Sequence, residues 1–516
     1  MRTVALRPCG RVKLTEVTPP AQVGASCDVA IVGAGAAGLA TAIFTRRLNP
    51  RASVHVFDGA RTPGAKILVS GGTRCNLTNV SVSDADFWGG SRAFIRRVLR
   101  AFPVRDTIAF FQEIGVHLHE EADGKLFPDG GRARDVLNAL LGELSRTGAE
   151  LHVSDRVVAI ERDEGGLRVV RPGGDVRASA VVLATGGQSL PKTGSDGAGF
   201  EMARRLGHTL VKTTPGLVPL VLDASADEEF HRDLTGVALP VELTIWIDNR
   251  VALRLEGALL WTHFGVSGPV ALNASRHYLR AQLEGRPCRI TASFCPGEDF
   301  EAVDARLDAM ALERPRASVQ SALASLVPAS TATALLRRLR IDPPTALAHF
   351  PRDDRRRLTH GLVGWPLAVT GSRGYNYAEV TAGGVSLDEV HPSTLESRVC
   401  PGLFLVGEIL DVDGRIGGFN FQWAWSSAHV AARALAGSTP RGIRLPAYAR
   451  TDSARATARP RRSCASAGPQ RRRVAGFACE APVGSGFSRI SLPRAVRAAP
   501  ACRRVRAASR SVRFSP

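Results

Sequence analysis

Two short apolar runs with an amphipathic stretch between them dominate the start of the patterned part of this chain. Val29–Val32 and Ser53–Phe57 are typical of buried strands, and Ala36–Leu48 is typical of a helix. A strand, a helix and a second strand in this order predict a parallel βαβ unit and hence an α/β, Rossmann-like domain. The same patterns predict further strands at 151–153, 157–162, 167–171, 180–183 and 401–408, and helices at 91–115, 134–147 and 421–436.

The pattern changes between residues 208 and 274, where long segments alternate apolar and polar positions. This alternation predicts antiparallel strands and therefore a second domain, which a helical stretch at 300–339 follows. The buried-strand pattern then returns at 401–408, so the first domain is split in sequence. We expect a disordered N-terminal extension (1–26), the α/β domain (27–190 and 373–436), an inserted β-rich domain (191–275 and 355–372), a helical subdomain (276–354) and a disordered Arg-rich tail (437–516).

Charge is concentrated at the two ends of the chain. The net charge is +19, of which residues 441–516 carry +16 and residues 1–26 carry +3, so residues 27–440 are neutral. The tail lacks interleaved aromatic residues, and we therefore do not expect nucleic acid as a partner. The nine cysteines form no C-x-x-C pair, which predicts no metal site and a reducing, cytoplasmic location. No apolar run reaches the length of a membrane span. The basic N-terminus lacks the apolar core of a secretion signal, so we do not expect secretion.

The first predicted turn carries the strongest chemical signal. Gly33, Gly35 and Gly38 follow the first strand with the spacing G-x-G-x-x-G, and Ala36 and Ala37 open the helix. The first glycine permits the turn, the second leaves room for a pyrophosphate, and the third lets the helix pack on the strand. Asp58 ends the second strand, where a carboxylate can accept hydrogen bonds from an adenosine ribose. These features predict a dinucleotide site.

Glycine-rich turns recur at strand ends and helix starts near Gly33, Gly71, Gly186 and Gly417. Such an array can line one long ligand, and FAD explains the returning C-terminal strand better than NAD does. Glu408, at the end of that strand, could accept hydrogen bonds from ribityl hydroxyls. Gly417 and Gly418 would direct N–H groups at the flavin pyrimidine, where negative charge builds on reduction. Thr185 and Gly186 offer bare backbone at a strand end.

Several segments resemble the YhiN/BaiN-type bacterial flavoproteins, often labelled NAD(P)/FAD-dependent or aminoacetone-oxidase-like oxidoreductases: GAGAAGLATA, GAKILVSGGTRCNLTN, WTHFGVSGPVAL, TAGGV and GEILDVDGRIGGFNFQWAWSSA. The resemblance implies a split FAD-binding domain, an inserted β-barrel and a small helical subdomain. One departure is Thr73, which stands where the family usually has glycine. The resemblance also implies a set of cofactor-binding residues: Gly33, Gly35, Gly38, Asp58, Lys66, Ser70, Gly71, Gly72, Arg74, Cys75, Asn76, Val157, Gly407, Glu408, Gly417, Gly418 and Asn420.

The expected reaction is hydride transfer between the flavin N5 and a small organic substrate, with NAD(P)H as a transient electron donor or with another diffusible redox partner. Arg74 would tune the ring or orient an anionic substrate, with Asn76 beside it. Cys75 is expected to be a packed residue rather than a redox thiol, and His263 a structural residue rather than a proton donor. The sequence leaves the catalytic acid or base, the substrate and the oligomeric state open. Two alternatives remain: a flavin-containing RNA-modifying enzyme and a non-catalytic flavin redox sensor.

Overall fold

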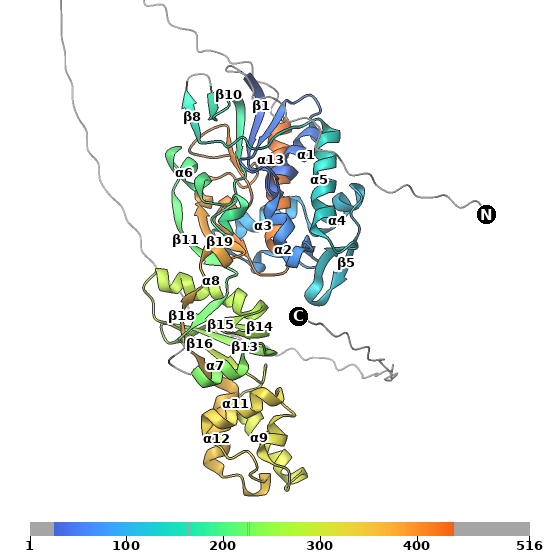
Figure 1. Cartoon of the computed structure of the whole chain (residues 1–516). Coiled ribbons are helices and arrows are strands. Elements are labelled where there is room, and N and C mark those ends of the chain that lie inside the picture. The colour runs from blue at the N-terminus through green and yellow to red at the C-terminus, as the bar shows by residue number, and fades with distance from the viewer. Residues whose placement is uncertain (1–24, 164–165, 224, 226–227, 438–516) are drawn as a thin grey trace, which may run out of the picture. The chain divides into compact units, whose positions relative to one another are not determined.

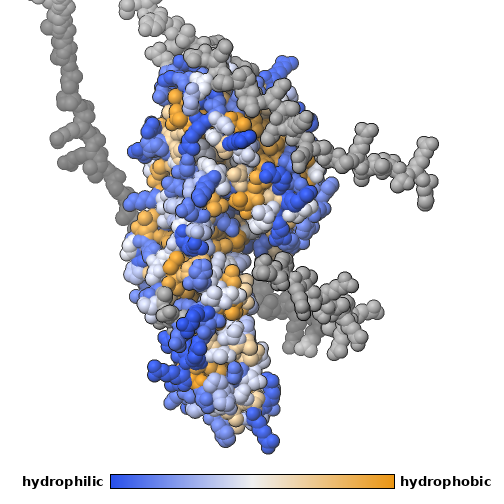
Figure 2. Space-filling model, viewed as in Figure 1, coloured by the Kyte–Doolittle hydropathy of each residue, from blue (hydrophilic) through white to orange (hydrophobic). Residues whose placement is uncertain are grey.

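The computed structural model of the protein describes residues 25–163, 166–223, 225 and 228–437. The predicted N-terminal extension up to residue 24 and the tail from residue 438 lie outside these ranges. Among the described helices, none is both long and apolar enough to cross a membrane. On the face shown in Figure 2, hydrophobic and hydrophilic residues are interspersed.

A seven-stranded sheet forms the centre of the α/β domain (Figure 1). The inner parts of its parallel strands are buried, which explains apolar runs such as Val29–Val32 and Val181–Leu183. The strand order is β7-β2-β1-β10-β9-β8, and β20 pairs with β10. The strands β7, β2, β1, β10 and β20 are parallel, and β8 and β9 form an antiparallel hairpin beside β10. Their bounds are β1 (Ala25–Val32), β2 (Val54–Phe57), β7 (Glu150–His152), β8 (Ala159–Asp163), β9 (Gly166–Val170), β10 (Val176–Leu183) and β20 (Leu403–Leu405).

Helix α1 (Ala36–Leu48) packs along α13 (Phe419–Gly437), although almost four hundred residues separate them (Figure 1). Both helices carry alanine on the buried faces, which lets their backbones approach closely. Helix α5 (Ala133–Thr147) packs on α1, and α3 (Arg92–Ala101) packs on α13. The α/β, Rossmann-like fold predicted from the sequence is confirmed.

The inserted region is built on a second, antiparallel seven-stranded sheet. Its strands β17 and β18 stand at opposite ends of the strand order, but only Ala368 separates them in sequence, so the sheet must curl strongly. No ladder joins these two strands in the part of the chain that the structure describes, and a closed barrel stays a prediction. The strand order is β17 (Trp365–Leu367), β16 (Cys288–Ser293), β13 (Ala238–Ile247), β14 (Arg250–Thr262), β15 (Gly265–Ser267), β12 (Leu220–Leu222) and β18 (Val369–Ser372).

Helices and a small two-stranded pair complete the insert and connect it to the first domain. Strand β11 (Leu210–Gly216) pairs with β19 (Val380–Val385), and α6 (Ala198–Arg205) packs into the hydrophobic core of the α/β domain. A separate hydrophobic core extends from Val218 to Ala378. It includes residues from the helices α8 (Pro269–Leu283), α9 (Phe300–Glu313), α10 (Val319–Leu323), α11 (Ala329–Leu339) and α12 (Arg352–Gly364), with α7 (Glu228–Leu234) packed on α11.

Three local predictions need correction. We expected residues 61–79 to be an extended loop, but Ala65–Thr73 forms α2, which departs from helical geometry in its last four residues, 70–73. The helix has a single buried residue, Ile67, so it lacks the apolar periodicity that marks longer helices. Pro103 splits the predicted helix at 91–115 into α3 and α4 (Val104–Glu113), because proline cannot continue a helix hydrogen-bond ladder. We also expected residues 124–133 to be a turn-rich connection, but β6 (Lys125–Pro128) lies there and forms a hairpin with β5 (Leu118–Glu121).

Candidate flavin site

A long cleft opens where the parallel strands of the α/β domain end. Gly33 follows β1, Asp58 follows β2, Thr185 follows β10 and Gly407 follows β20, and all four residues line this cleft. The carboxyl ends of parallel strands meet at one edge of a sheet, which is where α/β folds bind nucleotides. The topology therefore gathers four sequence segments, spread over 375 positions, around one cavity.

The three glycines of the first turn are needed for different structural reasons. Gly33 has a φ of +103°, and a Cβ there would lie 2.6 Å from the Ala184 carbonyl oxygen. A Cβ on Gly38 would lie 1.9 Å from the Gly33 carbonyl oxygen, so this position holds the helix against the turn. A Cβ on Gly35 would meet no atom within 4 Å, which leaves open space for a ligand. Gly35 also caps α1 without a side-chain hydrogen bond, so the first N–H groups of the helix remain available to a phosphate.

Asp58 holds the turn as well as facing the cleft. Its Oδ2 accepts a hydrogen bond from Ala34 N at 2.7 Å, and its Oδ1 accepts one from Ala60 N at 2.8 Å. A carboxylate has about four acceptor positions, so two remain for ribose hydroxyls. Val157 is buried beside this end of the cleft, where its neighbour Arg156 pairs with Asp196 at 2.7 Å.

The chain turns sharply at the end of α2 and directly after it, on the wall of the cleft. Thr73 and Cys75 have positive φ values of +72° and +64°, and Gly71 and Gly72 are also left-handed. Arg74 donates to Glu121 at 2.6 Å and lies 4.1 Å above the Phe127 ring. These contacts fix the guanidinium at the cleft wall.

Cys75 and Asn76 point in different directions. Cys75 is fully buried and does not line the cleft, and burial raises the pKa of its thiol to about 12. The thiol therefore stays protonated, which favours the packed residue over the redox thiol. Asn76 lines the cleft, and its amide fits its neighbours when its nitrogen donates to Thr78 O at 2.8 Å and its oxygen accepts from Gly418 N at 3.2 Å.

Lys66 and Glu408 form a polar centre that connects distant segments. Lys66 Nζ lies 2.8 Å from Glu408 Oε2 and 3.0 Å from Ser189 Oγ, to both of which it donates. Glu408 Oε1 accepts hydrogen bonds from Thr381 N and from Ser189 Oγ, both at 2.9 Å. The carboxylate predicted to bind ribityl hydroxyls is thus held in one orientation by the protein.

The far end of the cleft is formed by the turn before α13. A Cβ on Gly418 would lie 2.4 Å from Thr78 O, so this turn packs directly on the strand β3 (Thr78–Asn79). Asn420 exchanges two hydrogen bonds with the backbone of Gly414, at 2.8 and 2.9 Å. The turn therefore has little freedom to move.

The structure places nineteen of the twenty-one predicted cofactor residues on the cleft wall. The two exceptions are Gly38, which packs beneath the first turn, and Cys75. His263 does not line the cleft, and its ring packs edge-on against Phe264. The residues on the wall are Gly33, Gly35, Ala36, Ala37, Asp58, Lys66, Ser70, Gly71, Gly72, Arg74, Asn76, Val157, Thr185, Gly186, Gly407, Glu408, Gly417, Gly418 and Asn420.

Sequence reasoning missed two carboxylic acids in the cleft, Asp196, which pairs with Arg156, and Glu379. Glu379 lines the cavity and is exposed towards it, immediately before β19. Burial among the surrounding protein atoms raises the pKa of its carboxyl, and the positive charge of Lys66 opposes this shift only in part. The only signal in the sequence is its position two residues before the T-A-G-G-V segment.

The chain matches the family described as HI0933-like protein Rossmann domain over residues 27–434. It is 33% identical to the ribosomal RNA dihydrouridine synthase of Escherichia coli over 408 residues, 79% of this chain and 98% of that protein. It is 32% identical to the 3-dehydro-bile acid delta(4,6)-reductase of Clostridium scindens over 411 residues, again 79% and 98% of the two chains.

Among solved structures, the chain superposes on a quinol fumarate reductase FrdA of E. coli with a TM-score of 0.42 and 16% identity, covering 80% of this chain and 70% of that one. The relatives, in contrast, match over nearly their whole length at identities above 30%. This chain therefore belongs to the HI0933-like family and is a flavoprotein oxidoreductase with a Rossmann domain.

Proposed function

We propose that the protein binds FAD in the cleft and reduces a carbon–carbon double bond conjugated to a carbonyl group. The observation that carries this proposal is the cleft itself, which combines a phosphate-binding helix start, a ribose-binding carboxylate, a constrained turn and one carboxylic acid with a raised pKa. The cavity fits the cofactor because Gly35 and Gly72 leave open space where side chains would otherwise stand. Bound FAD would supply hydride chemistry at its N5 atom.

The residues of the cleft have separate tasks in this proposal. The first N–H groups of α1 hold the pyrophosphate, and Asp58 accepts hydrogen bonds from the adenosine ribose. Lys66 fixes the Glu408 carboxylate that faces the ribityl chain. Arg74, held by Glu121 and Phe127, orients the substrate carbonyl or stabilises negative charge near the ring.

Glu379 is the proposed proton donor. When hydride adds to the far carbon of a conjugated double bond, negative charge develops on the carbonyl side, and the carbon next to the carbonyl must take a proton. A carboxyl whose pKa is raised by burial holds that proton closer to neutral pH than an exposed glutamate does. Lys66 then stabilises the carboxylate that remains.

The two named relatives share this bond chemistry. Dihydrouridine is uridine whose 5,6 double bond, conjugated to a ring carbonyl, has been reduced, and a 3-dehydro-delta(4,6) bile acid carries a conjugated dienone. We propose uridine in ribosomal RNA as the first substrate to test, because two of the relatives, from E. coli and Haemophilus influenzae, carry that name. This brings forward the RNA alternative that composition alone did not favour. The conjugated dienone is the second candidate, supported by the C. scindens relative.

The test begins with the visible spectrum of the purified full-length protein. We expect a bound flavin that NADH or NADPH bleaches without oxygen, and that unmodified ribosomal RNA or a 3-oxo-4,6-diene steroid restores. Mass analysis of the product should show two added hydrogens, on uridine in one case and on the diene in the other. A flavin that no donor reduces would support the redox sensor, and a folded protein that takes up no flavin would refute the proposal.

A further inference from the structure

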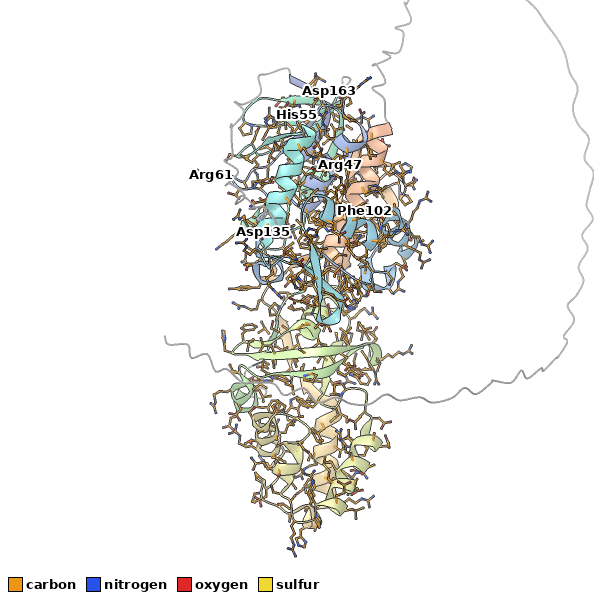
Figure 3. All side chains as sticks on the ribbon, turned by 90° about the vertical axis from the view of Figure 1, so that its right-hand side faces the viewer. Arg47, His55, Arg61, Phe102, Asp135 and Asp163 are labelled. Carbon is orange, nitrogen blue, oxygen red and sulfur yellow. The ribbon has the colours of Figure 1, made fainter. Side chains whose placement is uncertain are left out.

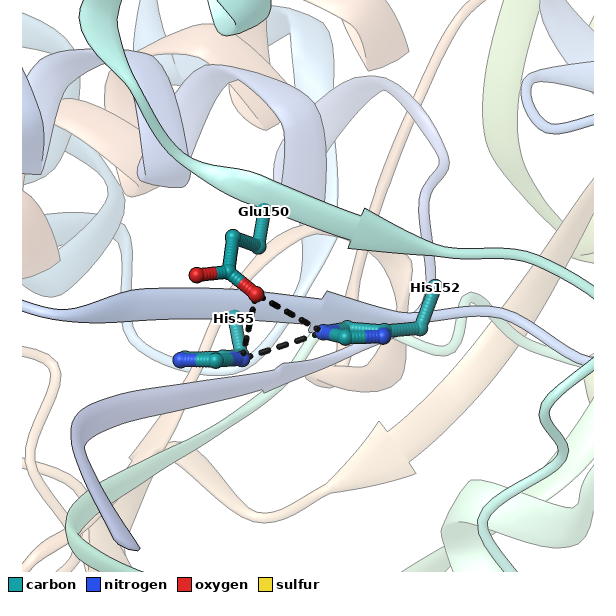
Figure 4. Close-up of side chains that lie close together, drawn as sticks. All are labelled: His55, Glu150 and His152. Carbon is teal, nitrogen blue, oxygen red and sulfur yellow. Dashed lines mark hydrogen bonds and ion pairs between the residues drawn. The ribbon is translucent and has the colours of Figure 1, made fainter. Parts of the chain in front are cut away.

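Two histidines and a glutamate, none of which lines the flavin cleft, gather at the outer edge of the parallel sheet (Figure 4). His55 lies on β2, and Glu150 and His152 lie on β7. In the parallel pairing of these strands His55 stands opposite Glu150, and Phe57 stands opposite His152. Because alternate residues of a strand point to the same face, all three side chains project from one face of the sheet. Figure 3 places His55 on the side of the α/β domain turned towards the viewer.

The three nearest donor atoms have the spacing of a metal tripod. His55 Nδ1 lies 3.0 Å from His152 Nε2 and 3.5 Å from Glu150 Oε2, and His152 Nε2 lies 3.7 Å from the same oxygen. A circle through three points at these separations has a radius of about 2.0 Å. Zinc binds imidazole nitrogen and carboxylate oxygen at about 2.0–2.2 Å. An ion just outside the plane of the three atoms would therefore reach all of them after small side-chain rotations.

Each imidazole offers one ring nitrogen to the cluster, and its other nitrogen faces away from it (Figure 4). Without an ion, either His55 Nδ1 or His152 Nε2 carries a proton and donates it to the other nitrogen. When an ion binds, each neutral ring can carry its proton on its other nitrogen, which leaves both of these nitrogens free to coordinate. Arg171 is paired with Asp155 and lies 4.7 Å above the Phe57 ring.

We propose that His55, Glu150 and His152 bind a divalent transition-metal ion, with zinc the preferred ion and water as its fourth ligand. The two imidazoles and one carboxylate are a donor set suited to zinc. His152 is almost fully buried, whereas the Glu150 side chain is 55% exposed, which gives the ion an entry path and room for the water. The ion would tie β7, an edge strand of three residues, to β2, whose next residue is Asp58 of the flavin cleft.

No pattern in the sequence marks this site, and we expected no metal site from the sequence. His55 and His152 are 97 positions apart, so no ligand spacing marks them. Only the pairing of β2 with β7 brings them together.

The test uses the full-length flavoprotein after treatment with a chelator. Zinc is titrated against a chromophoric chelator of known affinity at pH 7.5, and the same titration is run on three variants. H55Q removes one nitrogen ligand, and E150Q replaces the charged carboxylate with a neutral amide of nearly the same size. H119Q is the matched control, because His119 is an exposed histidine between the carboxylates of Glu121 and Asp129. Flavin absorbance and thermal unfolding without zinc establish that each variant is folded.

We expect the unchanged protein to bind one zinc ion per chain. H55Q and E150Q should each bind zinc at least about 100-fold more weakly than the unchanged protein, because loss of a direct ligand should exceed the 10–100-fold loss typical of outer-shell partners. H119Q should bind zinc like the unchanged protein. Zinc should also raise the unfolding temperature of the unchanged protein and of H119Q but not of H55Q, since a ligand that binds only the folded state stabilises it. If H55Q and E150Q retain the affinity of the unchanged protein, or if no zinc binds, the cluster is a hydrogen-bonded histidine pair and the proposal is wrong.

Discussion

The buried carboxyl of Asp411 gives a quantitative prediction about stability. Asp411 lies just before β21 (Val412–Gly414), next to Asp413, and is 8% exposed. Burial, together with the nearby Asp413 carboxylate, raises its pKa from 3.8 to about 6, although Arg280 and Arg276 oppose the shift. The folded state therefore holds the proton of Asp411 more tightly than the unfolded chain does. Stability from this group is fully present below pH 3.8 and is lost as the pH rises through about 6.

The substitution Asp411→Asn removes this titration. A rise of about 2.2 pKa units corresponds to about 3 kcal/mol at pH 8, where Asp411 is ionised in both states, and to about 1.5 kcal/mol at pH 5. D411N should therefore unfold with a free energy up to about 3 kcal/mol higher than the unchanged protein at pH 8. The difference in unfolding free energy between D411N and the unchanged protein should be about half as large at pH 5 as at pH 8.

The assay is urea unfolding of the full-length flavoprotein, followed by tryptophan fluorescence at pH 5 and at pH 8. Asp353→Asn, an exposed carboxyl at the start of α12, is the control, and it should change the unfolding free energy by only a few tenths of a kcal/mol at both pH values. A D411N protein that is less stable than the unchanged protein at pH 8 would refute the reasoning. So would an advantage that is the same at both pH values, because it would not arise from titration of Asp411.

Three further predictions follow from the site and its support. Glu379→Gln should lower kcat by about 10²- to 10⁴-fold with an unchanged flavin spectrum, and unchanged turnover would exclude Glu379 as the donor. Activity of the unchanged enzyme should fall as the pH rises through the raised pKa of Glu379, because the protonated acid is lost. Thr73→Gly should raise the free energy of unfolding by about 1 kcal/mol, since a β-branched residue is strained at a φ of +72°, and chemical denaturation measures it. The buried Arg276 guanidinium donates hydrogen bonds to both carboxylate oxygens of Asp413, at 2.5 and 2.9 Å. Asp413→Ala should lower the free energy of unfolding by about 3–5 kcal/mol, because it removes this carboxylate from a buried charge. The double variant with Arg276→Met should recover part of that loss, and a double variant with the summed losses would contradict this account.

Sequence alone determined what depends on neighbouring residues. The βαβ unit follows from local apolar periods, and the roles of Gly33 and Gly38 follow from the tight turn that this glycine spacing indicates between a strand and a helix. The split of the α/β domain was also predicted, because the buried-strand pattern near 401–408 returns after a long antiparallel region. These features depend on backbone sterics and on the burial of short segments, and both can be predicted from residues that are close together in the sequence.

Only the tertiary structure decided which distant side chains meet and how each is solvated. Lys66 bonds to Glu408 across 342 positions, and His55 meets His152 only because β7 pairs with β2. The raised pKa of Glu379 and the inert thiol of Cys75 both depend on atoms packed around them from other segments. A pKa is set by local solvation and by nearby charges, and neither quantity exists until the chain has folded.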